Sequence, residues 1–281
     1  MSASVAPWLE VRRGSAPLLV CFPHTGTDLT PQWQARFSST WVARKDADHW
    51  VHLLYDFAHA LGASSVRTQL SRSVIDVNRD PSGASLYPGQ TTTELCPLLT
   101  FDGEPLYAQA AEPDTDEIQR RREAYFAPYH AAVEAELARL RALHPRVVLY
   151  DAHSIRSLVP RLFDGVLPEL NLGTYDGKSC SPELQTTLER CCRDSGFSWV
   201  VNGRFKGGWT TRHYGTPERG VHAVQMELAC RSYLVEPVPP YLQTNWPAPY
   251  DAAHAARLQV TLRTLLQACL AFAAQADQGD V

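Results

Sequence analysis

The sequence contains no long apolar run. Hydrophobic residues make up 44% of its 281 positions, but no stretch approaches the roughly 20 residues that a membrane-spanning helix needs. Residues 1–10 also have neither the basic nor the apolar segment of a signal peptide. These absences favour a cytoplasmic protein with no membrane partner.

Two reactive patterns are missing as well. The seven cysteines include no CxxC pair, and several stand among apolar residues. This usage favours buried free thiols over disulfides or a thiolate zinc site. The GxSxG string of many serine hydrolases is also absent, which disfavours that class.

Neither sign of charge dominates the composition. The formal net charge is -4, so nothing indicates a nucleic-acid partner or an anionic membrane surface. The chain shows no internal repeat, no low-complexity tract and no clear linker. We therefore expect a single domain that spans residues 1–281.

Apolar periodicity predicts alternating strands and helices. Short apolar runs predict strands at residues 18–22, 64–68, 74–77, 147–150, 199–202 and 223–228. Helical patterns cover residues 48–61, 114–143, 182–194 and 251–274. Residues 81–100 and 156–177 are expected to form long loops. The alternation indicates an α/β fold, a mostly parallel sheet with helices on both faces.

Two histidines follow predicted strands. His24 comes just after the run 18–22, and His153 comes after the run 147–150. A single histidine in such a place is more often structural than a metal ligand. Sites in open α/β sheets form outside the carboxyl ends of strands, so two imidazoles delivered there favour a divalent metal such as zinc.

A carboxylate is expected as the third metal ligand. Asp48 is the preferred candidate and Asp46 the alternative, although Asp48 could be a helix N-cap and Asp46 a solvated loop charge. Asp28 is the third choice. Asp151 stands two residues before His153, on the same face of a strand, and is suited to accept the imidazole N–H opposite the metal. A cap or salt bridge is the alternative for Asp151.

An amide and a cationic side chain directly follow the strand predicted at residues 74–77. Asn78 and Arg79 could hold a carboxylate in a fork of hydrogen bonds. Arg72 could polarise a carbonyl group. An ion pair with Asp76 or Asp80 is the structural alternative for either arginine.

Two further features suggest a site. Residues 202–215 combine glycines with Arg204, Lys206, Arg212 and aromatic residues that include Tyr214, a composition suited to binding an anion, with an exposed basic loop as the alternative. Glu227 lies inside an otherwise apolar strand. A buried carboxylate needs a partner or a task, either an ion pair or the general base beside a metal-activated water.

In order, these strings resemble the N-formylglutamate deformylases (N-formylglutamate amidohydrolases), from about residue 17 to about residue 236. The resemblance is carried by residues 22–26, 46–48, 72–79, 150–157, 160–165, 171–174, 202–208 and 212–215. That family is distantly similar to zinc carboxypeptidases and aspartoacylase. It implies a phosphorylase/hydrolase-like three-layer α/β sandwich around a mixed sheet.

The resemblance also implies roles for particular residues. The zinc ligands would be His24, His153 and an acidic residue, with Glu227 as the base. The distant relatives place the acidic ligand three residues after the first histidine, but position 27 is Thr here, so Asp48 is expected to replace it. Arg72 would assist the zinc in stabilising the oxyanion. Asn78 and Arg79 would hold one substrate carboxylate. Beyond what the resemblance implies, we expect either Arg204 or Arg212 to hold the other carboxylate and Tyr214 to be a further substrate-binding residue.

The prediction is a single amidohydrolase domain with one bound zinc. It would hydrolyse N-formyl-L-glutamate, a small-molecule substrate, to formate and L-glutamate in histidine degradation. A deacylase of another N-acyl amino acid remains an alternative. So does a non-catalytic anion-binding protein of the same fold.

Overall fold

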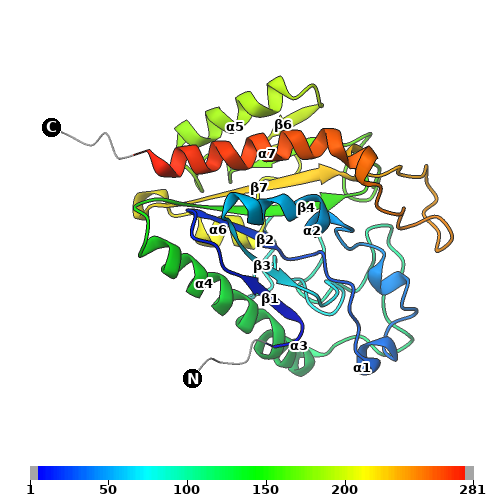
Figure 1. The fold of residues 1–281 in the computed structure, drawn as a ribbon. Helices are drawn as coiled ribbons and strands as arrows, with labels where there is room; N and C mark the ends of the chain where they lie inside the picture. Colours follow the sequence, from blue (N-terminus) through cyan, green and yellow to red (C-terminus); the bar gives the residue numbers. More distant parts are fainter. Residues whose placement is uncertain (1–5, 276–281) are drawn as a thin grey trace.

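A seven-stranded sheet forms the centre of the protein in a computed structural model that describes residues 6–275 (Figure 1). The strand order across the sheet is β1-β3-β2-β4-β7-β5-β6. The strands are β1 (Leu9–Arg12), β2 (Leu18–Phe22), β3 (Ser64–Thr68), β4 (Val147–Ile155), β5 (Leu170–Gly173), β6 (Trp199–Val201) and β7 (Val221–Ala229).

The central strands of the sheet are parallel. β3, β2, β4 and β7 pair in parallel, and β5 pairs in parallel with β6. β1 runs antiparallel to β3, and β5 runs antiparallel to β7. The chain moves from β2 outward to β3 and then returns to the other side of β2 with β4. The carboxyl ends of β2 and β4 therefore flank the switch point where open α/β sheets bind ligands.

Helices cover both faces of this sheet. In Figure 1, α5 (Pro182–Asp194) and α7 (Ala252–Ala274) lie above it and α4 (Ala127–Arg141) lies below. The remaining α-helices are α1 (Pro31–Gln34), α2 (Val51–Leu54), α3 (Thr115–Arg121) and α6 (Trp209–Tyr214), with a π-helical turn at Arg122–Phe126 between α3 and α4. Short 3₁₀ helices occupy Val42–Arg44, Asp56–Leu61, Pro217–Arg219 and Cys230–Ser232. The expected mixed, mostly parallel sheet with helices on both faces is confirmed.

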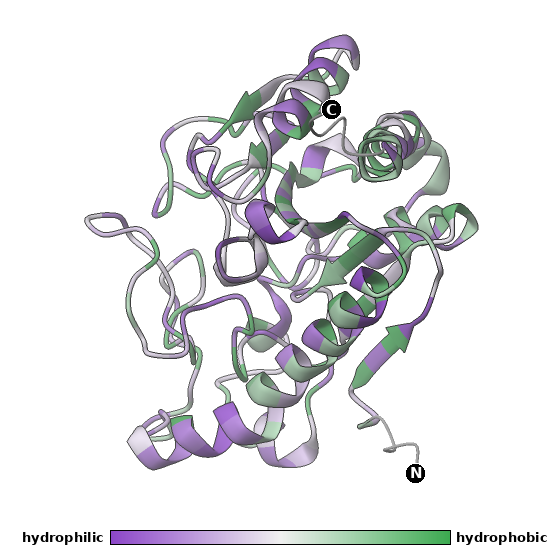
Figure 2. Cartoon of the chain, turned by 90° about the vertical axis from the view of Figure 1, so that its left-hand side faces the viewer, coloured by the Kyte–Doolittle hydropathy of each residue, from purple (hydrophilic) through white to green (hydrophobic). Residues whose placement is uncertain are grey.

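Alternation along the central strands divides the core into two layers. Leu18, Val20 and Phe22 of β2 face the layer beneath α7, whereas Leu19 and Cys21 face the α4 side. Hydropathy colouring shows the helices carrying hydrophobic stripes next to hydrophilic ones (Figure 2). Both faces of β2 and β4 are thus buried, which explains their continuous apolar runs.

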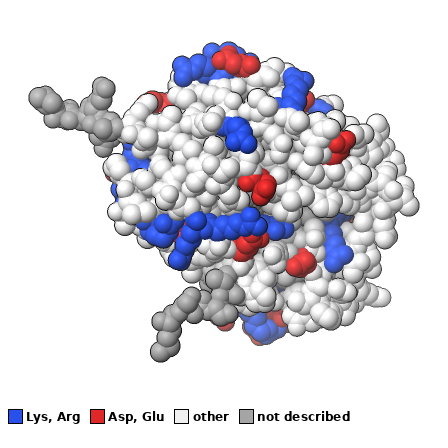
Figure 3. All heavy atoms as spheres, viewed as in Figure 1, with Lys and Arg blue, Asp and Glu red and all other residues white. Residues whose placement is uncertain are grey.

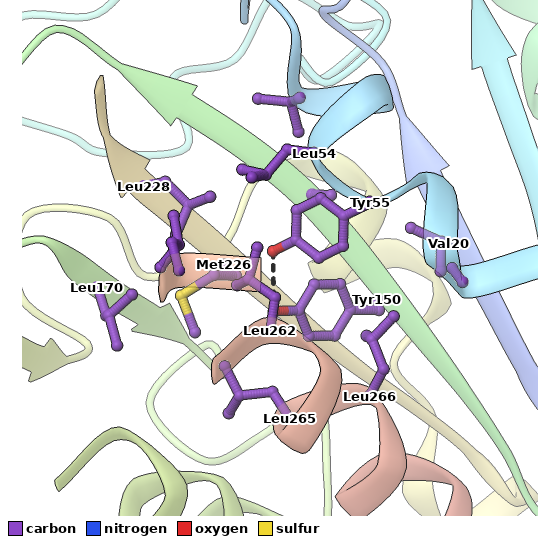
Figure 4. Close-up of a cluster of buried hydrophobic side chains, with 14 of the residues drawn as sticks. Val20, Leu54, Tyr55, Tyr150, Leu170, Met226, Leu228, Leu262, Leu265 and Leu266 are labelled. Carbon is purple, nitrogen blue, oxygen red and sulfur yellow. Dashed lines mark hydrogen bonds between the residues drawn. The ribbon is translucent and has the colours of Figure 1, made fainter. Parts of the chain in front are cut away.

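The α7-side core encloses a polar contact between two tyrosines. Figure 4 shows Tyr55 and Tyr150 facing each other among leucines, with their hydroxyl groups 3.1 Å apart. The contact satisfies two hydroxyls that would otherwise be buried without partners. Tyr55 directly follows α2, so the contact also holds the end of α2 against β4, which carries His153 further along.

Several predicted elements were wrong in extent or kind. Residues 74–77 form turns rather than a strand, although their apolar side chains are buried. The expected loop at 156–177 contains β5, and the strand predicted at 147–150 continues to Ile155. The helix predicted at 48–61 is divided into α2 and a 3₁₀ helix, and β1 and α6 were not predicted. These short elements depend on tertiary pairing more than on local periodicity.

All seven cysteines are free, six of them buried and Cys191 half-buried, as predicted. No helix within residues 6–275 is both long and apolar enough to cross a bilayer. On the face drawn in Figure 3, basic and acidic side chains are interspersed.

Candidate metal centre and substrate pocket

His24, Asp48 and His153 converge at the switch point between β2 and β4. His24 follows the end of β2, and His153 lies on β4, with the two ring centroids 4.8 Å apart. Asp48 Oδ2 lies 3.0 Å from His153 Nδ1 and 3.8 Å from His24 Nδ1. All three residues are buried, and their candidate ligand atoms lie within 4.8 Å of one another.

The other two candidate carboxylates lie elsewhere. Asp46 accepts a hydrogen bond from the Phe101 backbone N–H and pairs with Arg156. Asp28 is exposed. The backbone N–H of Asp48 donates to the carbonyl of His24, 2.9 Å away, which brings this carboxylate rather than the others to the histidines.

Each histidine is supported by an aspartate on its far side. His24 Nε2 lies 2.6 Å from Asp76 Oδ1, and His153 Nε2 lies 3.0 Å from Asp151 Oδ2. An imidazole that donates its Nε2–H to a carboxylate presents its Nδ1 lone pair, the form a metal requires. Both Nδ1 atoms therefore face Asp48 and the shared centre.

Electrostatics favour a neutral His24. Burial and the positive charge of Arg72 lower the pKa of His24 to about 4, although Asp76 and Asp48 partly oppose the shift. Burial also disfavours a charged His153, but the two carboxylates of Asp151 and Asp48 outweigh it and raise that pKa. The carboxylate cluster thus attracts positive charge.

The donor set fits a divalent cation. His24 Nδ1 and Asp48 Oδ1 are buried and have no hydrogen-bond partner within the described part of the chain. Unpaired buried polar atoms are rare and call for an explanation. Two imidazole nitrogens and one carboxylate are a common ligand set for catalytic zinc, and a cation here would use both orphan atoms.

Glu227 stands beside this centre. It occupies the register position on β7 opposite His153, and its Oε2 accepts a weak hydrogen bond from Gln225 Nε2 at 3.3 Å. Burial raises the pKa of Glu227 to about 8, and the nearby carboxylates of Asp48 and Asp151 act in the same direction. Since a bound cation would offset this shift, the side chain is placed to exchange protons near neutral pH.

Arg72 also approaches the centre. Its Nη2 forms an ion pair with Asp76 Oδ2 at 2.6 Å, and its Nη1 lies 3.6 Å from Asp48 Oδ1. The ring of Phe101 lies 5.0 Å from its guanidinium carbon. Arg72 is therefore fixed, with its guanidinium in the pocket wall.

One pocket joins these groups. His24, His153, Glu227 and Arg72 all line it, together with Asn78, Arg79, Thr91–Thr93 and Arg204. The Asn78 amide donates to Asp151 Oδ2 and accepts from the Thr210 backbone N–H. Gly208 packs so closely on Asn78 that a Cβ would lie 2.4 Å from its Nδ2, which explains a glycine in the segment 202–208.

Arg212 and Tyr214 lie outside the residues that line this pocket. Arg212 donates to the carbonyls of Gly207 and Leu86, so it ties two pocket loops together. The Tyr214 hydroxyl lies 2.8 Å from His130 Nδ1 in the α4-side core. Both residues belong to α6, which was expected to be part of a loop.

Two features of the site were missed from the sequence. Asp76 was considered only as an ion-pair partner of Arg72, yet it also holds His24. Asp76 stands four residues after Arg72, and this spacing predicts a contact between the two side chains only if the segment forms turns rather than an extended strand. Thr91–Thr93 lie in the long loop expected at residues 81–100, but the sequence gives these residues no particular role, because three threonines carry no distinctive chemistry.

Comparisons with known proteins agree on one family. A family model described as N-formylglutamate amidohydrolase matches residues 16–234. An N-formylglutamate deformylase of Pseudomonas aeruginosa is 45% identical over 265 residues, which cover 94% of this chain and 96% of that protein. One of Pseudomonas putida is 43% identical over 271 residues, which cover 96% and 98% of the two chains.

Solved structures share the fold. The crystal structure of an N-formylglutamate amidohydrolase from Ralstonia eutropha superimposes with a TM-score of 0.73 at 23% identity, covering 92% of this chain and 96% of that one. A gene product of Agrobacterium tumefaciens gives a TM-score of 0.71 at 16% identity, with coverages of 96% and 97%.

Proposed function

Because this chain belongs to the N-formylglutamate amidohydrolase family of hydrolases, we propose that it converts N-formyl-L-glutamate and water to formate and L-glutamate with one bound zinc ion. The family membership confirms the resemblance noted in the sequence. The observation that carries the proposal is the buried His24–Asp48–His153 cluster, with Glu227 and cationic side chains in the same pocket.

The cation would be held by His24, Asp48 and His153, with Asp76 and Asp151 orienting the two imidazoles. When bound, it supplies a Lewis acid that polarises a carbonyl and lowers the pKa of a water molecule to about 7. The two orphan atoms, His24 Nδ1 and Asp48 Oδ1, support this assignment.

Glu227 would act as the general base and then as the general acid. Its carboxylate accepts a proton from the attacking water as the new C–O bond forms on the formyl carbon. The same proton then passes to the departing nitrogen as the C–N bond breaks, which releases L-glutamate as the amine. Burial raises the pKa of Glu227 and a bound cation would offset part of that shift, which suits a group that must both take up and return a proton.

The arginines would bind the developing and permanent negative charges. Arg72, fixed by Asp76, is placed to donate to the oxyanion, an interaction worth on the order of 3 kcal/mol in related sites. Arg79 and one amide hydrogen of Asn78 would bind one substrate carboxylate. Arg204 lines the pocket and Arg212 does not, so we assign the second carboxylate to Arg204. Arg212 and Tyr214 would support the pocket from behind.

The test is formate release from N-formyl-L-glutamate by the purified protein. We expect activity that a chelator abolishes and added zinc restores, together with about one zinc per chain in metal analysis. N-acetyl-L-glutamate and N-formyl-L-leucine serve as acyl and side-chain controls and should react far more slowly. Release of formate at an undiminished rate from fully metal-free protein would refute the proposal.

A Glu227→Gln variant separates metal binding from chemistry. The amide keeps the size of the side chain but cannot accept the proton of the water. We therefore expect full zinc content and turnover that is slower by about a hundredfold or more. The zinc content of the variant is the control, since it shows whether a loss of turnover comes from a loss of metal. Turnover equal to that of the unsubstituted protein would remove Glu227 as the base.

A further inference from the structure

The two arginines assigned to the substrate carboxylates are anchored on one short segment. Arg79 donates from Nε to the carbonyl of Thr93 at 3.1 Å and from Nη2 to its hydroxyl at 2.9 Å. Arg204 donates from Nη2 to the carbonyl of Thr91 at 2.8 Å and from Nε to the carbonyl of Leu162 at 2.7 Å. The anchors on Thr91 and Thr93 are separated by one residue.

These bonds leave one end of each guanidinium free. Among the described residues, none accepts a hydrogen bond from Nη1 of Arg79 or from Nη1 of Arg204. Both side chains line the substrate pocket. Each therefore offers donors to a ligand while its other nitrogen atoms are held by the protein.

The pair lacks a matching negative charge. Within residues 6–275, Arg204 has no ion pair, and the carboxylate that Arg79 approaches is Asp76, 3.7 Å away and already bound to His24 and Arg72. Burial lowers the pKa of Arg204 and the charge of Arg79 acts in the same direction, while Tyr87 and the Glu227 carboxylate of the same pocket oppose the shift without reversing it. Keeping two such cations together is costly unless an anionic ligand compensates.

Tyr87, four residues before Thr91, holds the same loop against the loop that carries Arg204. The Tyr87 hydroxyl donates to the carbonyl of Gly207 at 2.9 Å and accepts from the Lys206 backbone N–H at 3.1 Å. The guanidinium carbons of Arg204 and Arg212 lie 5.4 Å and 4.7 Å from the centre of its ring. Tyr87 thus joins the loop that carries the threonines to the loop that carries Arg204.

We propose that Thr91–Thr93 is a specificity-determining segment that sets the spacing of the Arg79 and Arg204 guanidinium groups. Two cations at a fixed spacing select dicarboxylates by the distance between their carboxylates. The inference rests on the proposed function and extends it: the segment makes the site prefer N-formyl-L-glutamate to the shorter N-formyl-L-aspartate. Thr93 is the position where a side chain, rather than the backbone alone, fixes this spacing.

The test compares kcat/KM for N-formyl-L-glutamate and N-formyl-L-aspartate in Thr93→Val and in the unsubstituted enzyme. Valine keeps the shape of threonine but cannot accept the Arg79 hydrogen bond. We expect kcat/KM for the glutamate substrate to fall on the order of tenfold, mainly through KM, and the preference over the aspartate substrate to shrink. Thr93→Ser, which retains the hydroxyl, should restore most of the preference.

Thr264→Val is the matched control. It removes one threonine hydroxyl, which donates to Val260 within α7, far from the pocket in sequence and on another element. An unchanged substrate preference in Thr93→Val, in protein with normal zinc content and thermal unfolding, would overturn the inference. The proposed function fails by a different result, namely no formate release from either substrate by the unsubstituted enzyme.

A second measurement needs no variant. Glutarate and succinate differ by one methylene and carry no formyl group, so the ratio of their competitive inhibition constants compares two spacings of the carboxylates without the reacting amide. We expect glutarate to inhibit the unsubstituted enzyme severalfold more tightly than succinate, since one methylene is worth at least that much in a fixed site. Equal inhibition by the two would refute a fixed spacing even if Thr93→Val failed to fold.

Discussion

Asp76→Asn tests how this protein prepares its metal centre. Asp76 is fully buried and holds three groups: His24 Nε2 at 2.6 Å, Arg72 Nη2 at 2.6 Å and the Asn78 backbone N–H at 2.9 Å. Asparagine has the same shape but only one acceptor oxygen. If that oxygen faces His24, the new NH₂ group opposes the Arg72 donor.

The opposite orientation is equally unfavourable. With the NH₂ group toward His24, Nε2 must become the acceptor, so the proton moves to Nδ1 and blocks the atom that faces Asp48. In the first orientation, by contrast, the unpaired Arg72 is drawn toward Asp48, whose Oδ1 is 3.6 Å from its Nη1, and it competes with a cation for that carboxylate. Loss of such a supporting group typically costs 10- to 100-fold in metal affinity, about 1.4 to 2.8 kcal/mol.

The assay is a zinc competition titration with a chromophoric chelator, run beside thermal unfolding of the metal-free protein. We expect weaker zinc binding by at least tenfold and, because a buried ion pair is broken, a loss of folding stability of about 3 kcal/mol. Asp28→Asn removes an exposed carboxylate and is the control. Zinc affinity equal to that of the unsubstituted protein would refute the role assigned to Asp76.

Three further outcomes follow from the structure. Asp48→Ala should lose zinc in metal analysis, whereas Asp46→Ala should keep it and lower the unfolding temperature; the reverse pattern would contradict the ligand assignment. Burial lowers the pKa of His130 to about 4. The neutral imidazole therefore makes its full contribution to the free energy of unfolding above pH 6.5, and that contribution is lost as the pH falls towards 4, by about 2 kcal/mol between pH 7 and 5. Denaturant titrations of His130→Gln should show a smaller loss of unfolding free energy over the same pH range. Gly208→Ala should push Asn78 from its place, and circular dichroism should remain native while kcat/KM falls about tenfold; unchanged kinetics would show that the contact is tolerant.

Much of the site followed from strand ends. His24 and His153 were predicted as neighbours because buried parallel strands deliver their following residues to one edge of the sheet. Glu227 was noticed because a carboxylate in an apolar strand needs a task. These inferences use only residue type and strand periodicity. The regular geometry of β2, β4 and β7 then brings the residues at and near the strand ends together in the folded protein.

The arrangement of the loops could not be predicted in the same way. Asp46 and Asp48 are two residues apart, yet one pairs with Arg156 and the other faces the histidines, because the backbone between them is irregular. Arg204 and Arg212 are equally cationic in sequence, but only the first lines the pocket. Side-chain direction in such segments is decided by long-range packing rather than by a local period.

The sequence alone determined the family, the chemistry available and the edge of the sheet where it gathers, since those depend on residue types and short-range patterns. The tertiary structure decided which carboxylate meets the histidines, which aspartate supports each imidazole and how the arginines are spaced. Those choices arise from contacts such as His24 with Asp76 and Arg79 with Thr93. They form only when loops far apart along the chain are packed over the same strands.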